Sequence, residues 1–322
     1  MAFDPDQLDA LAAVVHEGSF DAAAQRLHVT PSAVSQRVKA LEQQVGRVLV
    51  LRTRPCRPTE DGEVLVRLAG QIDVLGRDAL GQLVPSPGST RPVPSAAAMR
   101  RLPVAVNDDS MSTWFPDALA DLPADVLLDL RREDQDLSAD LLRDGTVMAA
   151  VTADPRAVQG CRVRRLGAMR YLAVAAPERR AQWFGGGLRA EAFAAAPLLA
   201  FNREDGLQER FVAAAVGRRS AAPLVHYVPS QGAFVRLIEA GIGWGMVPSA
   251  AAADALARGT LVELRAGRHL DVPLYWQHWA LRTPTLDDLT DRVVRAAAAA
   301  LRPVAPHGPA PRRAADRPVG DG

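Results

Sequence analysis

Two runs of apolar side chains at helical spacing, separated by a tight break, limit what residues 19–54 can fold into. The first run is Phe20, Ala23, Ala24 and Leu27, and the second is Val34, Val38, Leu41 and Val45. Between them, Thr30 is a natural N-cap, and Pro31 suits the first position of a helix, where its missing N–H costs nothing. The spacing therefore predicts two short helices joined by a tight turn, the outline of a helix-turn-helix.

The second predicted helix carries polar side chains on the faces that its core does not need. After the turn residues Thr30 and Pro31, they are Ser32, Ser35, Gln36, Arg37 and Lys39. Side chains of these types reach base edges and phosphates in a major groove. Residues 37–57 are also basic, with six Lys or Arg against Glu42 alone, whereas residues 1–36 carry five acids against Arg26. The pattern predicts a double-stranded DNA partner, and chance clustering in an arginine-rich chain is the alternative for the charge alone.

The overall composition is that of a soluble globular protein. Of the 322 residues, 48% are hydrophobic and 23% are charged, and this length suits two or three domains. The two cysteines, Cys56 and Cys161, form no CxxC pattern, so neither a disulfide framework nor a thiolate metal site is expected. The N-terminus lacks the pattern of a signal peptide, and no apolar run reaches the roughly 18 residues of a membrane span. We therefore expect a cytoplasmic protein without a membrane partner.

A short β-rich segment and a long helix follow the predicted helix-turn-helix. Residues 48–59 predict a winged hairpin, in which Arg52 and Arg54 hold the sugar-phosphate backbone. Residues 60–83 predict one helix with the a/d spacing of a coiled coil, formed by Leu65, Leu68, Ile72, Leu75 and Ala79. Such a narrow seam indicates pairing with a second copy of the chain, and packing against the chain's own core is the alternative.

The order and spacing of residues 20–62 carry a family resemblance. The positions that carry it are Ala23, Ala24, Leu27, Thr30, Pro31, Ser32, Ala33, Val34, Ser35, Val38, Leu41, Glu42, Gly46, Leu49, Arg52, Pro58, Thr59 and Gly62. In this order they resemble the N-terminal signature of LysR-type transcriptional regulators. The resemblance implies a winged helix-turn-helix, a dimerising linker helix and an effector domain similar to periplasmic binding proteins. Val50 stands where the family usually has Phe, so we expect a smaller core there without loss of DNA binding.

The rest of the chain predicts an α/β domain of two lobes behind a Pro/Ser/Gly-rich linker. Apolar runs alternate with helical stretches, and the predicted strands are residues 102–106, 126–130, 147–151, 171–175, 198–201, 224–228, 244–247 and 274–281. Such alternation favours mostly parallel sheets, with a ligand at the carboxyl ends of the strands. The predicted organisation is residues 1–59 (winged helix-turn-helix), 60–83 (linker helix), 84–99 (flexible linker), 100–302 (effector-binding α/β domain) and 303–322 (disordered tail).

Three predicted strand-to-helix turns carry polar caps, at residues 107–114, 202–206 and 229–232. A helix N-terminus with free N–H groups and a nearby hydroxyl is a ready carboxylate site, and the acidic side chains beside these turns suit a cation. A ligand with both kinds of end is an amino acid, especially a basic one. Each turn taken alone can equally be an ordinary cap.

Segments scattered over the second half also carry a resemblance, in the order 102–114, 171–174, 200–211, 228–235 and 274–276. Behind the N-terminal signature, they are similar to the arginine- and lysine-responsive (ArgP/LysG-like) branch of the LysR-type regulators. The resemblance implies a response to lysine or arginine and activation of an exporter of basic amino acids. It also implies an effector site, whose predicted residues are Asp109, Ser110, Thr113, Trp114, Glu133, Asp134, Asn202 and Ser230.

Within that site the resemblance implies separate roles for hydroxyl, acidic and aromatic side chains. Ser110 and Thr113 are expected to take the α-carboxylate of the effector, with Ser230 nearby in the second lobe. One of the predicted acids faces the amino or guanidinium group, and which acid does so stays open. Trp114 is expected to pack against the aliphatic stem.

Competing chemistry finds no support in the sequence. The six histidines have no metal-ligand spacing, and no nucleophile elbow, phosphate loop or dinucleotide loop occurs, so we expect no enzyme, no metal and no cofactor. One alternative keeps the LysR-type role but changes the effector to a different amino acid or a metabolite anion. A more distant one is a ligand-binding or catalytic α/β domain whose helix-turn-helix docks a protein. The expected partners are a DNA operator, lysine or arginine, and a second copy of the chain, as a homodimer or a dimer of dimers.

Overall fold

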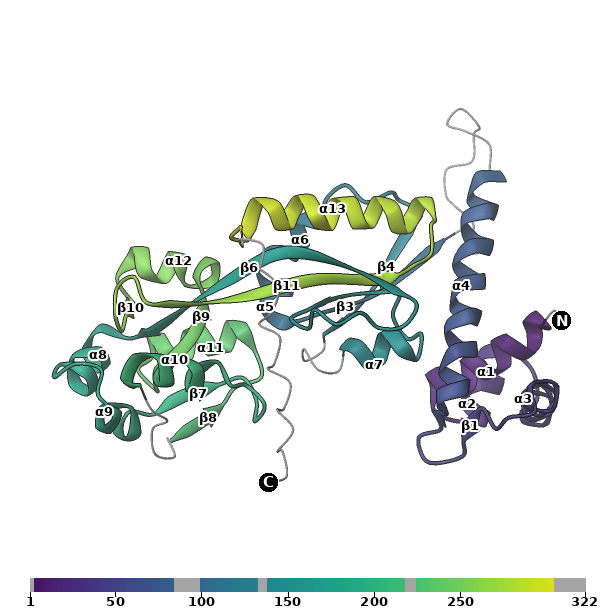
Figure 1. The fold of residues 1–322 in the computed structure, drawn as a ribbon, viewed down its shortest axis with the longest axis horizontal. Coiled ribbons are helices and arrows are strands. Elements are labelled where there is room, and N and C mark those ends of the chain that lie inside the picture. Colours follow the sequence, from purple (N-terminus) through teal and green to yellow (C-terminus); the bar gives the residue numbers. More distant parts are fainter. Residues whose placement is uncertain (1–2, 84–98, 133–137, 218–223, 304–322) are drawn as a thin grey trace, which may run out of the picture.

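The computed structural model describes residues 3–83, 99–132, 138–217 and 224–303 of the chain. Apart from Met99 and Pro303, the predicted flexible linker and disordered tail lie outside the described residues, as do Glu133 and Asp134. Figure 1 shows an N-terminal helical unit, one long helix that stands beside it, and a larger α/β domain that extends away from both.

The N-terminal unit has the architecture of the predicted winged helix-turn-helix. Its elements are the helices α1 (Pro5–Glu17), α2 (Phe20–Leu27) and α3 (Pro31–Val45), and the antiparallel wing strands β1 (Val50–Leu51) and β2 (Arg57–Pro58). The hydroxyl of Thr30 caps α3 by accepting a hydrogen bond of 3.2 Å from the backbone N–H of Ala33, and Pro31 is the first residue of the helix. This cap confirms the turn chemistry predicted from the sequence.

The predicted apolar stripes form the core of this unit. The most buried residues of the two stripes, each at most 2% exposed, are Ala23, Ala24, Val34, Val38 and Leu41. Val50 on the wing joins the same core at 4% exposure, so the smaller residue at this position is still a core residue. The wing and the start of the long helix that follows it complete this core.

The α/β domain begins directly after Met99. Its strands are β3 (Arg100–Val106), β4 (Val126–Arg132), β5 (Ala149–Thr152), β6 (Cys161–Ala175), β7 (Leu198–Ala200), β8 (Val225–Tyr227), β9 (Gly245–Pro248), β10 (Val262–Glu263) and β11 (His269–Trp279). Its helices are α5 (Asp108–Ser112), α6 (Phe115–Ala118), α7 (Ser138–Arg143), α8 (Pro177–Phe184), α9 (Ala190–Ala195), α10 (Leu207–Val216), α11 (Gln231–Glu239), α12 (Ser249–Arg258) and α13 (Pro284–Ala300).

The main sheet is mixed, so the prediction of mostly parallel sheets was wrong. Its order is β10-β6-β11-β5-β3-β4, with β9 also paired to β6. Only the β3–β4 and β3–β5 pairs of this sheet are parallel, whereas β6 and β11 pair antiparallel with each other and with their other neighbours. The reason is the length of β6 and β11, which run in opposite directions between the two lobes. A local alternation of strands and helices does not show which strands make such a crossing.

The two-lobed α/β architecture predicted from the sequence is confirmed. In Figure 1, lobe I (β3–β5, α5–α7 and α13) lies next to the long helix, and lobe II (β7–β10 and α8–α12) lies at the far end, with β6 and β11 passing from one to the other. One apolar core runs through both lobes, from Val293 on α13 to Trp244 in lobe II. The ring of Trp244 packs 5.2 Å from that of Phe193, between their centroids.

The long helix α4 (Glu60–Leu83) contributes to two cores. Leu65, Val66 and Ala69 pack into the core of the N-terminal unit, and Val74 packs into the core of the α/β domain. The helix therefore connects the two units by packing as well as by sequence. Among the described residues, no helix is both long and apolar enough to cross a membrane.

A close approach and a buried polar cluster fix α4 to lobe I. A Cβ atom on Gly70 would lie 2.7 Å from Cη2 of Trp279, so only glycine allows this contact. About two turns further on, the buried carboxylate of Asp78 accepts a hydrogen bond from the hydroxyl of Thr285. Arg100 donates to the same hydroxyl at 2.7 Å and lies 3.9 Å from Asp78. Lobe I thus compensates the buried charge on α4, and removing one partner would leave that charge unpaired.

Replacing Gly70 with Ala is expected to destabilise the protein, because the added methyl group meets the ring of Trp279. Overpacking of this kind costs about 1–3 kcal/mol, against a helix-propensity gain of about 1 kcal/mol. Gly76→Ala is the matched control on the same helix, since no described atom lies within 4 Å of its Cβ position and only the gain applies. Urea unfolding measures both variants. Equal stabilities of the two would contradict the close packing of α4 on lobe I.

Candidate DNA-binding surface and inter-lobe site

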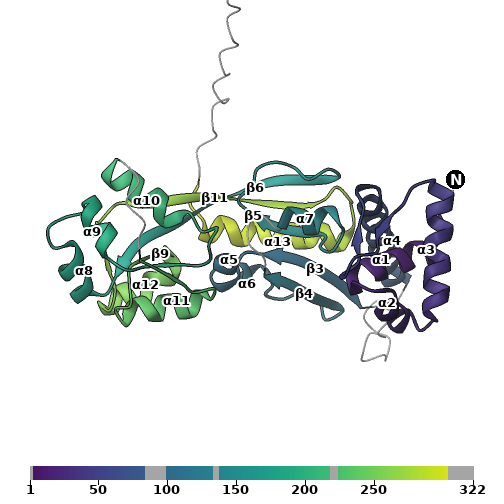
Figure 2. The ribbon, with the colours of Figure 1, turned by 90° about the horizontal axis from the view of Figure 1, so that it is seen from below.

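The surface of α3 carries a polar face, and each of its members lies three or four residues from another member. They are Ser32, Ser35, Gln36, Lys39 and Gln43, of which Ser35 is half-buried and the others are exposed. These steps keep side chains on one side of a helix, opposite the buried valines and leucine. Figure 2 shows α3 at the outer end of the molecule, on the side away from the α/β domain. Gln43 was not among the predicted residues, although its spacing from Lys39 could have identified it.

Arg37 lies apart from this face. Its guanidinium donates to the carboxylate of Asp6 on α1, with a distance of 2.7 Å between the nitrogen and the oxygen. At 3.6 residues per turn, Arg37 lies about 140° around the helix from Ser32, close to the side that packs on α1. The structure therefore gives this predicted DNA contact a partner within the protein. The pairing joins residues 31 positions apart, and spacing within one helix could not show it.

The wing places further cations beside α3. Arg52 and Arg54 are exposed on the segment between β1 and β2. The guanidinium carbon of Arg52 lies 4.9 Å from the centroid of the Phe20 ring, at the start of α2. This cation–π contact holds Arg52 against the helix-turn-helix, while the charge stays open to solvent. Lys39, Arg52 and Arg54 are thus predicted DNA contacts whose charges are exposed, and Arg57 on β2 is a further exposed cation of the wing.

Three carboxylates surround the place where α5 of lobe I meets lobe II, here called the inter-lobe site. Asp108 and Asp109 begin α5 directly after β3, and Asp205 lies in the turn after β7. Burial raises the pKa of Asp109 to about 6, and the charges of Asp108 and Asp205 add to the rise. The hydroxyl of Tyr171 donates to Asp109 at 2.6 Å and partly offsets it. At neutral pH Asp109 is therefore an ionised, poorly solvated carboxylate, which a cation would stabilise.

Tyr171 was missed from the sequence as a residue of this site. It lies on β6 and is 1% exposed, so its pattern was that of an ordinary core residue in a strand. Burial, followed by the charge of Asp109, raises the pKa of Tyr171 well above its usual value, so that the phenol keeps its proton. It can therefore act only as a hydrogen-bond donor to the Asp109 carboxylate.

Asp108 reaches across to lobe II. Its Oδ2 accepts a hydrogen bond of 2.9 Å from the backbone N–H of Gln231, the first residue of α11. Its Oδ1 lies 3.6 Å from a guanidinium nitrogen of Arg132. Ser230, at the N-cap of α11, makes no side-chain cap hydrogen bond, so the carboxylate of Asp108 serves the end of this helix instead.

The structure separates the predicted hydroxyl and aromatic residues. Asp109, Ser110 and Ser230 belong to the two ends that meet at the inter-lobe site, and the fully buried hydroxyl of Ser110 has no hydrogen-bond partner among the described residues. Thr113 instead donates to the backbone carbonyl of Asp109 at 2.5 Å. Thr113 and the buried Trp114 line a cavity of about 230 Å³, together with residues of β6 and the ends of α12 and α13.

The turn after β7 uses its polar side chains locally. Oδ1 of Asn202 accepts a hydrogen bond of 3.0 Å from the N–H of Glu204. Asp205 accepts from the N–H groups of Phe201 and Leu207, at 2.9 and 3.1 Å. For these bonds the ordinary-cap alternative holds, because each satisfies a backbone donor between the end of β7 and the first residue of α10. Glu133 and Asp134, which follow β4, lie outside the described residues.

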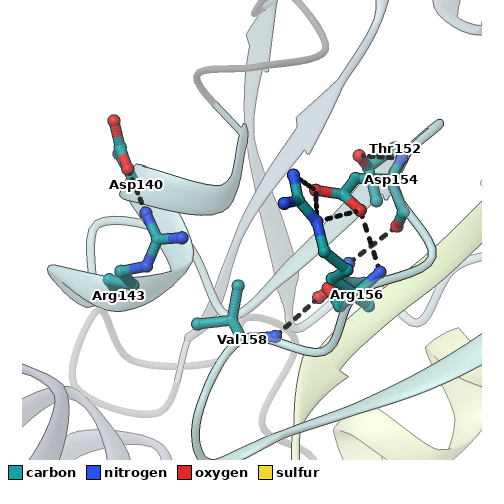
Figure 3. A network of polar contacts seen from close by, with 7 residues as sticks. Asp140, Arg143, Thr152, Asp154, Arg156 and Val158 are labelled. Carbon is teal, nitrogen blue, oxygen red and sulfur yellow. Dashed lines mark hydrogen bonds and ion pairs between the residues drawn. The ribbon is translucent and has the colours of Figure 1, made fainter. Parts of the chain in front are cut away.

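A polar network fixes the third strand end at this edge of the sheet (Figure 3). The hydroxyl of Thr152, the last residue of β5, accepts from the N–H of Asp154 at 3.0 Å, and Asp154 pairs with Arg156 at 2.7 Å. From β11, the buried Gln277 donates to the carbonyls of Asp154 and Arg156 and accepts from the N–H of Val158. Because β3, β4 and β5 are parallel, their carboxyl ends lie at the same edge of the sheet, and the network holds the loop after β5 against β11.

Both parts of the chain match known families. Residues 5–63 match the bacterial regulatory helix-turn-helix protein, lysR family, and residues 95–298 match the LysR substrate binding domain. A winged helix-turn-helix and a two-lobed ligand domain define the class as bacterial DNA-binding regulators. The chain belongs to the LysR family, whose members are transcriptional regulators and not enzymes.

Individual relatives match over almost the whole chain. The transcriptional regulator LysG of Mycobacterium tuberculosis is 51% identical over 298 residues, which cover 92% of this chain and 94% of the relative. The crystal structure of ArgP from Mycobacterium tuberculosis has a TM-score of 0.83 at 49% identity, covering 94% of this chain and 100% of that one.

A third relative carries a ligand. The lysine export transcriptional regulatory protein LysG of Corynebacterium glutamicum is 42% identical over 306 residues, covering 93% of this chain and 100% of the relative. Its full-length structure with bound effector Arg has a TM-score of 0.75 at 41% identity, with 93% and 100% of the two chains covered.

Removing the charge of Lys39 or Arg52 by substitution with Ala is expected to weaken binding to every DNA sequence. Each substitution should lower the slope of log affinity against log salt by about one, because one phosphate contact is lost. Gln36→Ala should instead reduce discrimination between sequences by about 1–3 kcal/mol. Fluorescence anisotropy across a salt series measures both effects. Arg258→Ala in lobe II is the matched control, and a Lys39→Ala slope equal to the control's would contradict the assigned surface.

Proposed function

We propose that this chain regulates transcription by binding an operator through α3 and the wing, under the control of lysine or arginine bound at the inter-lobe site. The observation that carries the proposal is the partly buried Asp109, which has the charges of Asp108 and Asp205 close to it and pairs with no cationic side chain among the described residues. Three carboxylates from two lobes favour a cationic ligand. The bound Arg in the Corynebacterium glutamicum LysG structure supports the same effector class.

The proposed effector is held at both of its ends. Its amino or guanidinium group pairs with Asp109, whose orientation is fixed by the hydroxyl of Tyr171. Its α-carboxylate meets the N-terminus of α11, with Ser110 and Ser230 supplying hydroxyl groups. Thr113, Trp114, Asn202, Glu133 and Asp134 stay predicted contacts of the effector. By analogy with the lysine export regulator, the proposed target is a gene for export of basic amino acids.

A metabolite anion is the less favoured effector. Placing a second anionic group beside Asp108, Asp109 and Asp205 would add repulsion to a site where burial already disfavours negative charge. A neutral amino acid has only its α-ammonium group as a cation, and it lacks the side-chain cation that the proposed effector pairs with Asp109. The carboxylates therefore support a basic amino acid over both alternatives.

We further propose that the chain acts as a homodimer joined through α4, on DNA in the cytoplasm. Val64, Ile72 and Leu75 leave between 42% and 50% of their surface exposed on this helix. Leu65, which was predicted to begin the seam, is only 7% exposed and packs into the chain's own core. The exposed seam is thus displaced by one residue at its start, and it runs through Val64 and Leu68 to Ile72 and Leu75. A paired copy of α4 would cover it.

Ile72→Lys is expected to shift the chain from dimer to monomer, because it places a charge in the proposed seam. Ile242→Lys is the matched control, since both isoleucines are 42% exposed and Ile242 lies in lobe II. Sedimentation velocity at micromolar concentration separates the two states. A dimeric Ile72→Lys protein, or equal dissociation of both variants, would contradict pairing through α4.

Asp109→Asn is expected to weaken arginine or lysine binding about 10- to 100-fold, because a charge-assisted hydrogen bond contributes about 1.5–3 kcal/mol. The amide oxygen still accepts from Tyr171, so the fold around it is kept. In the wild type, affinity should fall as the pH drops below about 6, where Asp109 takes up a proton. Titration calorimetry between pH 5 and 8 tests this, and unchanged affinity or pH dependence in the variant would contradict the proposed role.

The same variant is expected to be more stable than the wild type at pH 8 but not at pH 4. A carboxyl whose pKa is raised by folding favours the folded state below its unfolded value and loses that contribution as the pH rises through about 6. The neutral amide avoids this loss. Thermal unfolding of the effector-free proteins at the two pH values gives the comparison.

A further inference from the structure

We propose that Asp108 is an internal competitor of the effector, because its carboxylate holds the helix end that the effector's α-carboxylate would bind. The inference rests on the proposed function, which brings that carboxylate to the N-terminus of α11. Asp108 thereby gains a regulatory role, because the proposed effector pairs its cation with Asp109 and not with Asp108.

The first observation is the geometry of the Asp108 contact. The bond from the N–H of Gln231 to Asp108 is 2.9 Å long and joins residues 123 positions apart, one in each lobe. The side chain of Asp108 is 14% exposed, so the contact is largely shielded from water. A carboxylate on a helix N-terminus interacts with the free N–H groups and with the helix dipole, as an amino-acid carboxylate would. Asp108 and the effector therefore need the same donors.

The second observation is that Asp108 satisfies only part of this end of the site. The side-chain nitrogen of Gln231 is buried without a hydrogen-bond partner in the described parts of the chain, and so is the hydroxyl of Ser110. Ser230 also leaves the end of α11 without a side-chain cap. Buried donors without acceptors cost about 1–3 kcal/mol each, and a ligand carboxylate could supply acceptors to more of them than the single Asp108 oxygen does. The site is thus built for a carboxylate besides that of Asp108.

The third observation is that Asp108 has a second partner within reach. Oδ1 of Asp108 lies 3.6 Å from the guanidinium of Arg132, whose side chain is 55% exposed. When an effector carboxylate takes the N–H of Gln231, Asp108 keeps Arg132 as its counter-charge. Displacement therefore leaves no unpaired buried carboxylate, which would otherwise make the exchange costly. The effector carboxylate can therefore replace the Asp108 carboxylate at the N-terminus of α11 while Asp108 stays next to Arg132.

This exchange predicts selectivity for the carboxylate of the ligand. A diamine or a decarboxylated amino acid can pair with Asp109 but cannot replace Asp108 on α11. A basic amino acid can do both, and its binding includes the cost of displacing Asp108. Removing Asp108 should therefore favour ligands that carry a carboxylate and give no such gain to ligands that lack one.

The test compares arginine with agmatine, which is arginine without its carboxylate, on the full chain. Asp108→Ala is expected to raise the ratio of the agmatine to the arginine dissociation constant about 3- to 10-fold, the equivalent of one hydrogen bond. The ratio cancels the general loss of negative charge, which affects both cations. Asp287→Ala, at an exposed acid of lobe I, is the control and should leave the ratio unchanged. Asp108→Asn, which keeps a weaker acceptor, should fall between the two and replaces the alanine variant if that fails to fold.

Hydrogen exchange of the Gln231 amide tests the contact without any ligand. Asp108→Ala should speed this exchange at least tenfold, while Asp287→Ala should not change it. Equal loss of affinity for both ligands in Asp108→Ala would make Asp108 a cation partner and overturn the competitor role alone. An unchanged exchange rate of the Gln231 amide in Asp108→Ala would also overturn the competitor role. If neither arginine nor lysine binds the wild type, the proposed function fails, and the competitor role fails with it.

Discussion

The packing of α4 into two separate cores is the constraint on which the rest of the structure depends. Leu65, Val66 and Ala69 close the DNA-reading unit, and Val74 belongs to the core that runs through both lobes. The contact of Gly70 with Trp279 admits no side chain, so α4 cannot slide on lobe I without a rearrangement of that ring. The helix-turn-helix, α4 and lobe I are therefore packed together as one unit.

Within the described parts of the chain, lobe II makes no core contact with the helix-turn-helix. It is joined to lobe I through β6 and β11, through the apolar core that both lobes share, and through the bond between Asp108 and Gln231. A ligand at the inter-lobe site touches both parts, and its differential affinity for their arrangements is what could shift a population between them. The coupling is reciprocal, so DNA that favours one arrangement must also change effector affinity. Protonation of Asp109 near pH 6 would weaken the binding of a cationic ligand between the lobes, and with it this coupling.

How much the sequence predicts depends on the distance over which each interaction acts. The cap of Thr30 on α3, the apolar stripes and the run of α4 follow from neighbours within one or two turns, and they were predicted correctly. The pairing of Arg37 with Asp6 and the bond from Tyr171 to Asp109 join distant segments, and no local pattern contains them. The mixed sheet was missed for the same reason, since only the tertiary structure shows that β6 and β11 cross between lobes. The effector residues were proposed through resemblance, and the fold brings Asp109, Ser110 and Ser230 to one junction while Thr113 and Trp114 line a cavity.

We propose above all that partly buried carboxylates between the lobes select the positive charge of a basic amino acid. Titration calorimetry of the full wild-type chain with two matched pairs, arginine against citrulline and lysine against norleucine, tests it most directly, because each pair differs mainly in the terminal charge. The account predicts that at least one charged member binds and that its uncharged partner binds at least about tenfold more weakly, the loss of one charge-assisted contact. Equal binding of citrulline or norleucine, or binding of glutamate in preference to all four, would contradict it.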